Sequence, residues 1–168
     1  LDSFEAYQAR LEEDAREWGV LDGLCRVTIT RFRRDHSVWD LLVGEVLPTL
    51  AESAVERGER TLRVWSCGCA SGEEAGTLSL AWRLGVGKPL GLEVIGTDVD
   101  AAVLERAVRG CYPAGVLREL PDEWREQGFE DTGAGPDRWC LRERVRAHLR
   151  FVRQDVRTEA PEGPFDLV

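Results

Sequence analysis

The stretch that most constrains the fold of this chain is residues 61–77, which read Thr-Leu-Arg-Val-Trp-Ser-Cys-Gly-Cys-Ala-Ser-Gly-Glu-Glu-Ala-Gly-Thr. An apolar run from Leu62 to Trp65 predicts a buried strand, the small residues 66–72 break it, and apolar residues at helical spacing follow from Leu78. A strand, a glycine-containing turn and a helix are typical of the start of a nucleotide-type site. Glycines let the backbone approach a ligand, and the helix start offers unpaired N–H groups.

Glu73 and Glu74, at the start of the predicted helix, discriminate between ligands. A pyrophosphate would meet two negative charges there, which argues against a nucleoside triphosphate and against an NAD-binding dehydrogenase domain. A cationic ligand with ribose hydroxyls suits the position, because carboxylates accept hydrogen bonds from hydroxyls and attract an amine or a sulfonium. S-adenosylmethionine (SAM) has this chemistry. The alternative is that the two acids only stabilise the helix N-terminus through its dipole.

Composition and charge exclude several other classes. The 168 residues, 43% hydrophobic and 32% charged, suit one soluble globular domain. A net charge of −9 argues against general nucleic-acid binding, which needs Lys and Arg to neutralise phosphates. No run approaches the ~18 apolar residues of a membrane helix and no signal peptide is visible, so we expect a cytoplasmic protein without membrane insertion. The chain begins at Leu1 and contains no methionine, so we expect a piece of a longer protein.

The five cysteines of the chain form no recognisable framework. Cys67 and Cys69 lie in the turn, and no second Cys or His pair has zinc-finger spacing. We therefore expect reduced cysteines and no metal site.

Local patterns predict helices on both sides of this turn. Residues 3–17 form an amphipathic pattern with Ser3 as a possible N-cap, and a second helix is expected from about Val38 to Val55, interrupted by Pro48. Asp100 is a possible cap for a helix that follows the second strand.

Acids follow two further predicted strands. The strand Leu92–Gly96 is followed by Asp98, and in doubly wound sheets an acid just past the second strand takes the ribose hydroxyls. The alternative is that Asp98 is an ordinary turn residue. A strand at Leu149–Arg153 is followed by Asp155, whose carboxylate can accept from an adenine amino group, and another strand begins at Phe165.

The predicted fold class is therefore α/β, a SAM-type Rossmann-like parallel sheet that is preceded by helices and ends in mid-strand, so that it is incomplete at its C-terminus. Residues 1–58 form an N-terminal helical region with a linker, and residues 59–168 form the SAM-binding domain. Prolines and glycines interrupt the strand–helix rhythm over about 112–148, which predicts an inserted β-subdomain.

Three stretches, Val27–Asp35, Val64–Glu74 and Gly96–Asp100, carry a specific combination of motifs. A turn of the form Trp-Ser-x-x-Cys-Ala-Ser/Thr-Gly-Glu-Glu follows a Thr-x-Phe-x-Arg stretch. Together they resemble the CheR-type chemotaxis receptor glutamate methyltransferases, a class of SAM-dependent enzymes. The similarity extends over essentially the whole chain.

The resemblance implies roles for individual residues. Thr30 and Arg34 match family positions that reach into the SAM and substrate site, and they are the catalytic candidates. Glu74 matches the acid at the methionine part of SAM, and Asp98 matches the ribose-binding acid. The other candidates for cofactor binding are Gly68, Cys69, Gly72, Asp155 and Val156.

The activity that the resemblance implies is methyl transfer from SAM to a glutamate carboxylate of a protein, such as a chemoreceptor or another signalling protein, with no nucleic-acid partner. In some members the β-subdomain docks on a receptor tail. Two alternatives stay open: methylation of another protein or of a small molecule, and a non-catalytic SAM-binding module. Arg33 in place of the family's Phe, and Ala75-Gly76 in place of its Pro-Tyr, favour the module.

Overall fold

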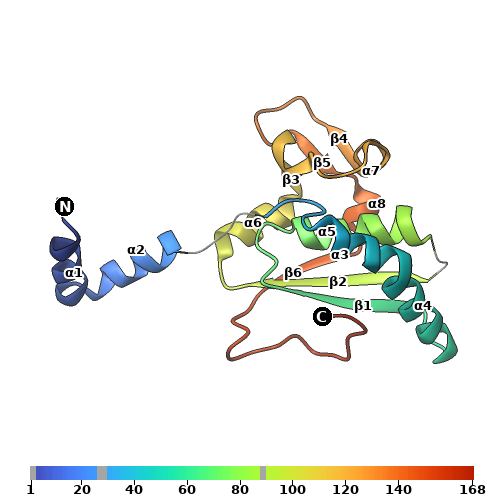
Figure 1. Cartoon of the computed structure of the whole chain (residues 1–168), viewed down its shortest axis with the longest axis horizontal. Helices are drawn as coiled ribbons and strands as arrows, with labels where there is room; N and C mark the ends of the chain where they lie inside the picture. Colours follow the sequence, from blue (N-terminus) through green and yellow to red (C-terminus); the bar gives the residue numbers. More distant parts are fainter. Residues whose placement is uncertain (1–2, 26–29, 88–89) are drawn as a thin grey trace.

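The computed structural model describes residues 3–25, 30–87 and 90–168. Figure 1 shows two sheets of unequal size with helices packed around them, and a pair of N-terminal helices that lies to one side. Within the described ranges, no helix combines the length and the hydrophobicity that a membrane span requires.

The larger sheet is parallel and has the strand order β1-β2-β6. Its strands are β1 (Thr61–Cys67), β2 (Gly91–Asp98) and β6 (Leu149–Arg153). Cys67 lies opposite Thr97, and β6 is in parallel register with β2, so the carboxyl ends of all three strands meet at one edge. The sequence predicted these strands from their apolar runs, and the Rossmann-like α/β class is confirmed.

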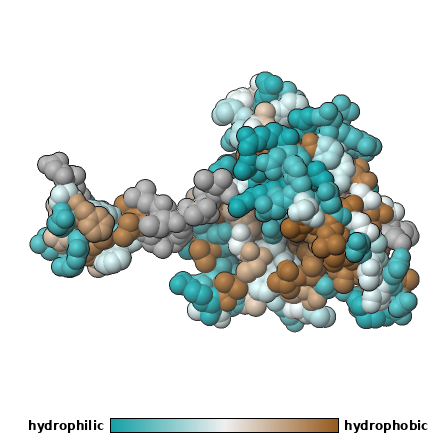
Figure 2. Space-filling view, viewed as in Figure 1, coloured by the Kyte–Doolittle hydropathy of each residue, from teal (hydrophilic) through white to brown (hydrophobic). Residues whose placement is uncertain are grey.

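The strand expected from Phe165 is reduced to a single parallel bridge between Val64 and Leu167. Within the described residues, the outer side of β1 is therefore hydrogen-bonded to residues 166–167 over Arg63 to Trp65. Figure 2 shows apolar atoms over this edge and over the neighbouring helix α3 (His36–Leu41). Exposed apolar side chains include Val38 and Leu41 on α3 and Val168 at the end of the chain.

Helices on the sheet supply its main core. The helix expected over 38–55 is α3, a π-helical turn η1 (Leu42–Val46) and α4 (Leu47–Glu56) in succession. Pro48 lies in the first turn of α4, directly after the π-helical turn η1; because the residues before it are helical, its missing N–H removes one backbone hydrogen bond where the helix changes from π to α. The crossover from β1 to β2 is α5 (Glu73–Leu80) followed by η2 (Ala81–Val86). Buried residues of this core include Leu47, Leu62, Val64, Leu78, Trp82 and Val94.

Two caps that the sequence predicted are present. The Asp100 carboxylate accepts from the Ala102 N–H at 2.8 Å at the start of α6 (Ala101–Arg109), and the Ser3 hydroxyl accepts from the Ala6 N–H at 3.2 Å. These assignments are confirmed.

The prediction of a single N-terminal helix over residues 3–17 is wrong. The structure has α1 (Phe4–Glu13) and α2 (Ala15–Cys25), separated by Asp14 in an extended conformation. The Asp14 carboxylate accepts from the Arg16 N–H at 3.0 Å, so it caps a new helix instead of continuing the first.

A second, antiparallel sheet of order β3-β5-β4 stands above the larger one in Figure 1. We call residues 111–142 the β-subdomain. Its elements are β3 (Cys111–Tyr112), η3 (Ala114–Leu117), α7 (Asp122–Gly128), β4 (Phe129–Asp131) and β5 (Trp139–Leu141), and α8 (Glu143–Arg146) leads back to β6.

Cys111 and Cys140 face each other across β3 and β5 and form a disulfide. The expectation that the cysteines are reduced is therefore wrong for this pair. Their separation of 29 residues gives no local signal, because the pairing depends on the register of two strands. Cys67 and Cys69 are free thiols, as expected.

Candidate active site

The turn that joins β1 to α5 forms one wall of the candidate site. The N–H groups of Gly68 and Cys69 both donate to the Thr97 carbonyl, at 2.8 and 2.9 Å, so the turn bends over the end of β2. Gly68 has a φ of +71°, a conformation that favours glycine. A Cβ placed on Gly68 would meet no protein atom within 4 Å. The backbone here faces open space that a ligand can fill.

Gly72, at the other end of the turn, has a packing role instead. Its φ is +87°, and a Cβ would lie 3.0 Å from Ala107 and 3.0 Å from the Phe151 ring. Glycine is therefore needed for the turn to fit against α6 and β6. The predicted contact of Gly72 with a cofactor stays a prediction.

The two glutamates at the start of α5 face different surroundings. Glu74 is exposed, and its carboxylate accepts from the Ser66 hydroxyl at the end of β1. Glu73 is only 1% exposed, and both of its oxygens accept from the Ser71 hydroxyl. Glu74 is therefore the acid of this pair that a ligand can reach.

Asp98 connects the two strand ends. One carboxylate oxygen accepts from the Ala70 N–H at 3.0 Å and the other accepts from the Asp100 N–H at 3.0 Å. Each oxygen keeps a further lone pair, so a ribose hydroxyl can still donate to either. The Asp98 carbonyl also accepts from the Gln154 N–H, which brings the end of β6 to the same edge.

Asp155, expected beside an adenine, already binds a guanidinium. Arg157 Nε lies 2.9 Å from one carboxylate oxygen and Nη2 lies 2.6 Å from the other. Hydrogen bonds from Arg157 lower the pKa of Asp155 to about 2. The neighbouring Val156 is exposed. The adenine contacts of both residues stay predictions.

Buried groups beneath the turn keep their protons at neutral pH. Burial, followed by the charge of Asp98, raises the pKa of the Cys69 thiol to about 12, so Cys69 is not a thiolate nucleophile. Burial also raises the pKa of Tyr112, whose hydroxyl donates to the Ser71 carbonyl at 2.9 Å.

Arg34 lies on a linker, residues 30–35, that three elements hold. The Phe32 N–H donates to the Val116 carbonyl in the β-subdomain at 3.1 Å. The Arg33 N–H donates to the Thr77 hydroxyl on α5 at 3.0 Å. The Arg34 carbonyl accepts from the Trp39 indole N–H on α3 at 2.8 Å.

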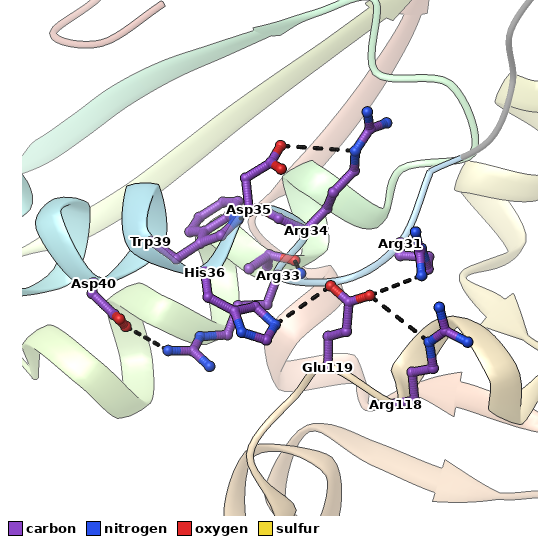
Figure 3. Close-up of polar contacts among 10 residues, drawn as sticks. Arg31, Arg33, Arg34, Asp35, His36, Trp39, Asp40, Arg118 and Glu119 are labelled. Carbon is purple, nitrogen blue, oxygen red and sulfur yellow. Dashed lines mark hydrogen bonds and ion pairs between the residues drawn. The ribbon is translucent and has the colours of Figure 1, made fainter.

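The backbone on both sides of Arg34 is strained. Arg33 has a φ of +53° and Asp35 has a φ of +62°, although neither is glycine. Such conformations cost about 1–3 kcal/mol each and persist only where surrounding contacts impose them. The Arg34 side chain is 56% exposed, and its Nε lies 3.7 Å from the Asp35 carboxylate. Figure 3 shows its guanidinium on the opposite side of the linker from Glu119 and Arg118.

Hydrogen bonds connect the linker to the first turn of α5, which begins at the edge of the sheet. The Thr77 hydroxyl that accepts from Arg33 donates in turn to the Glu73 carbonyl at 2.7 Å. Thr30 is partly buried at the start of the linker. Hydrogen bonds from Gly68 and Cys69 to Thr97 and from Ala70 to Asp98 thus bring the turn and Asp98 together at the sheet edge. Thr30 and Arg34 lie on the neighbouring linker, and their contacts with substrate or cofactor stay predictions.

Gly76→Ala should destabilise the protein by about 1–3 kcal/mol through overpacking. A Cβ at this position would lie 2.7 Å from the ring of Phe32, which is fully buried and cannot retreat. Gly44→Ala is the matched control, because a Cβ there meets nothing within 4 Å and alanine favours a helix. Denaturant unfolding of both variants is the measurement, and equal stability of the two would contradict the prediction.

Glu73→Gln should make the protein more stable than the wild type at pH 8, with the difference shrinking toward pH 4. Burial raises the pKa of Glu73 above its ordinary value of 4.5. The folded state therefore holds this proton more tightly than the unfolded state, and stability is lost as the pH rises through the folded pKa. Glutamine does not titrate and still accepts from Ser71. Denaturant titrations at both pH values test this, and a pH-independent difference would contradict it.

A parallel sheet with an acidic rim and a glycine turn open to a ligand defines the class of SAM-binding α/β methyltransferase domains. Residues 28–168 match the family model described as CheR methyltransferase, SAM binding domain. The chain therefore belongs to the CheR methyltransferase family, and the family and cofactor predicted from the sequence are confirmed.

Curated relatives are similar over most of the chain. A chemotaxis protein methyltransferase of Listeria monocytogenes is 33% identical over 166 residues, which cover 99% of this chain and 60% of that protein. Chemotaxis protein methyltransferase 1 of Pseudomonas aeruginosa is 31% identical over 83% of this chain and 52% of its own length. The Salmonella typhimurium protein of the same description is 30% identical, with 100% and 57% covered. The chain thus spans little more than half of these relatives.

The side chains at the rim fit SAM. Glu74 has an exposed carboxylate that would suit the cationic methionine part, Asp98 keeps lone pairs that would accept from ribose hydroxyls, and the open space over Gly68 would admit an adenosyl group. Their chemistry is the one expected for a cation that carries hydroxyls.

Proposed function

We propose that the protein transfers a methyl group from SAM to a carboxylate oxygen of a protein glutamate in a chemotaxis-like signalling system. The observation that carries the proposal is the strained linker around Arg34, which the Arg33 N–H joins by a hydrogen bond to α5, the helix whose first turn presents Glu74 at the same sheet edge as Asp98. The relatives named chemotaxis protein methyltransferase support the choice of substrate class.

Methyl transfer to a carboxylate depends on the orientation of the donor and the acceptor more than on acid–base catalysis. When bound, SAM supplies a methyl group on a sulfonium. Glutamate, with a pKa of about 4.3, is already ionised near neutrality, so no residue has to remove a proton. The tasks left to the protein are to hold the donor, align the acceptor and exclude water. The Arg34 guanidinium suits the second task, because its fork matches a carboxylate.

Two departures from the family motif favour a non-catalytic module: Arg33 in place of Phe, and Ala75-Gly76 in place of Pro-Tyr. The contacts of Arg33 and Gly76 give each a role in packing. Arg33 pairs with Asp40 on α3 and sends its side chain away from Arg34 (Figure 3). Gly76 leaves room for the Phe32 ring. Both substitutions belong to the packing of the linker, and neither takes a carboxylate from the rim, which supports an enzyme over a module.

Methyl transfer from labelled SAM by the whole protein tests the proposal. The acceptors are cytoplasmic fragments of chemoreceptors, and the readout is label that base treatment releases as volatile methanol, since only a methyl ester is cleaved in this way. We expect base-labile label on the protein acceptor. SAM binding without transfer would favour the module, and label confined to small molecules would favour the other acceptor class.

A further inference from the structure

We infer that Glu119 of the β-subdomain is a positioning residue for Arg34, so that the β-subdomain sets the geometry of the active site. The catalytic part of this inference rests on the proposed function. Glu119 lies 85 positions from Arg34 in the sequence, and nothing in the motif around Arg34 points to it.

One carboxylate holds both ends of the linker turn. Arg31 Nη1 lies 2.9 Å from one oxygen of Glu119, and His36 Nε2 lies 3.4 Å from the other. Arg118 Nε is 3.8 Å away, and Figure 3 shows the side chains of Arg31, His36 and Arg118 converging on Glu119. Arg31 and His36 stand immediately before and after residues 32–35, the segment that contains both left-handed residues.

Packing from the same subdomain holds the middle of the turn. The Phe32 ring lies edge-on to Tyr112, with centroids 4.9 Å apart, and edge-on to Phe129 at 5.1 Å. Phe32 is fully buried in a cluster that includes Leu117 and Leu120, which flank Arg118 and Glu119 in the sequence. The β-subdomain therefore holds the linker by polar contacts at its ends and by apolar contact between them.

This arrangement explains how two strained residues persist beside Arg34. A strained turn relaxes when its anchors are removed, because the backbone then returns to ordinary φ values. Thr77 and Trp39 contact the linker at Arg33 and Arg34 from α5 and α3, whereas Glu119 contacts the side chains of Arg31 and His36. Loss of the Glu119 carboxylate should therefore displace Arg34. A misplacement of about 1 Å can reduce turnover by about a hundredfold.

The test compares Glu119→Ala and Glu119→Gln with Glu105→Ala, which removes an exposed carboxylate from α6. In the whole protein, we expect Glu119→Ala to speed amide hydrogen exchange about tenfold in peptides that cover residues 31–38, with no change in peptides of β1. Its kcat for methyl-ester formation should fall about 10–100-fold, and the Kd for SAM measured by calorimetry should stay within about twofold. Glu119→Gln still accepts from Arg31 and should keep more activity, and Glu105→Ala should behave as the wild type.

Unchanged exchange over residues 31–38, or an unchanged kcat, in Glu119→Ala would overturn the inference. Faster exchange throughout the parallel sheet would also overturn it, because the carboxylate would then serve only general stability. If Glu119→Ala does not fold, the same readouts on Glu119→Gln decide. A wild type that forms no methyl ester would refute the proposed function, whereas the exchange data alone still decide whether Glu119 holds the linker.

Discussion

Arg34→Ala should lower methyl transfer by about two orders of magnitude or more while the protein stays folded. A hydrogen bond to a charged group is worth about 1.5–3 kcal/mol, and a guanidinium fork makes two of them to one carboxylate. Every 1.36 kcal/mol of lost transition-state stabilisation slows the reaction about tenfold. The side chain is 56% exposed and the exposed Asp35 is one of its partners, so truncation opens no cavity. The bond from Trp39 to the Arg34 carbonyl does not involve the side chain and should remain.

The experiment measures kcat for methyl-ester formation, SAM affinity by calorimetry and the thermal midpoint for three variants. Arg34→Lys keeps the charge and loses the fork, so it should fall between wild type and Arg34→Ala. Arg109→Ala is the matched control, because it removes an exposed arginine at the end of α6. A loss of SAM affinity with kcat retained would assign Arg34 to the carboxylate of the cofactor. Turnover within about twofold of the wild type would remove Arg34 from the site.

The sequence predicted the fold where the determinants are local. Strands β1, β2 and β6 follow apolar runs that end at small or acidic residues, and the caps at Ser3 and Asp100 depend on neighbours two or three residues away. The failures involve choices that local pattern leaves open. Asp14 can continue the first helix or cap the second, and the hydrogen bond that its carboxylate accepts from the Arg16 N–H favours the cap. The pairing of Cys111 with Cys140 depends on how two strands meet.

The same distinction between local and long-range determinants applies to the candidate site. Glu74 and Asp98 could be placed at one edge, since residues that follow parallel strands meet there. The sequence gives no sign that Arg33 and Asp35 are left-handed, because glycine, the usual signal for this conformation, is absent. Contacts with the β-subdomain stabilise that conformation, and Glu119 lies more than eighty residues further along the chain. Tertiary packing thus determines the position of Arg34, whereas its identity is encoded in a motif.

Asp98→Ala should weaken SAM binding by about 1.5–3 kcal/mol, which is about 10–150-fold in Kd, because hydrogen bonds from ribose hydroxyls to a charged acceptor are lost. The variant also deprives the N–H groups of Ala70 and Asp100 of their acceptor, so a weaker Kd alone could reflect a distorted turn. Asp98→Asn keeps one carbonyl oxygen and should lose less. Asp100→Ala is the control, since it removes a helix cap at the same strand end and should lower stability by about 1 kcal/mol with SAM affinity unchanged.

A SAM analogue that lacks the ribose hydroxyls separates direct contact with Asp98 from support of the turn. Removal of the hydroxyls should weaken binding to the wild type about 10–150-fold and should have little further effect in Asp98→Ala, because the variant has already lost their acceptor. A distorted turn would instead weaken SAM and the analogue equally, and the penalty for the missing hydroxyls would be the same in both proteins. That second result would show that Asp98 holds Ala70 in its left-handed conformation and does not touch the ribose. Calorimetry of the two ligands with the two proteins therefore distinguishes a ligand of the cofactor from a residue that only shapes the rim.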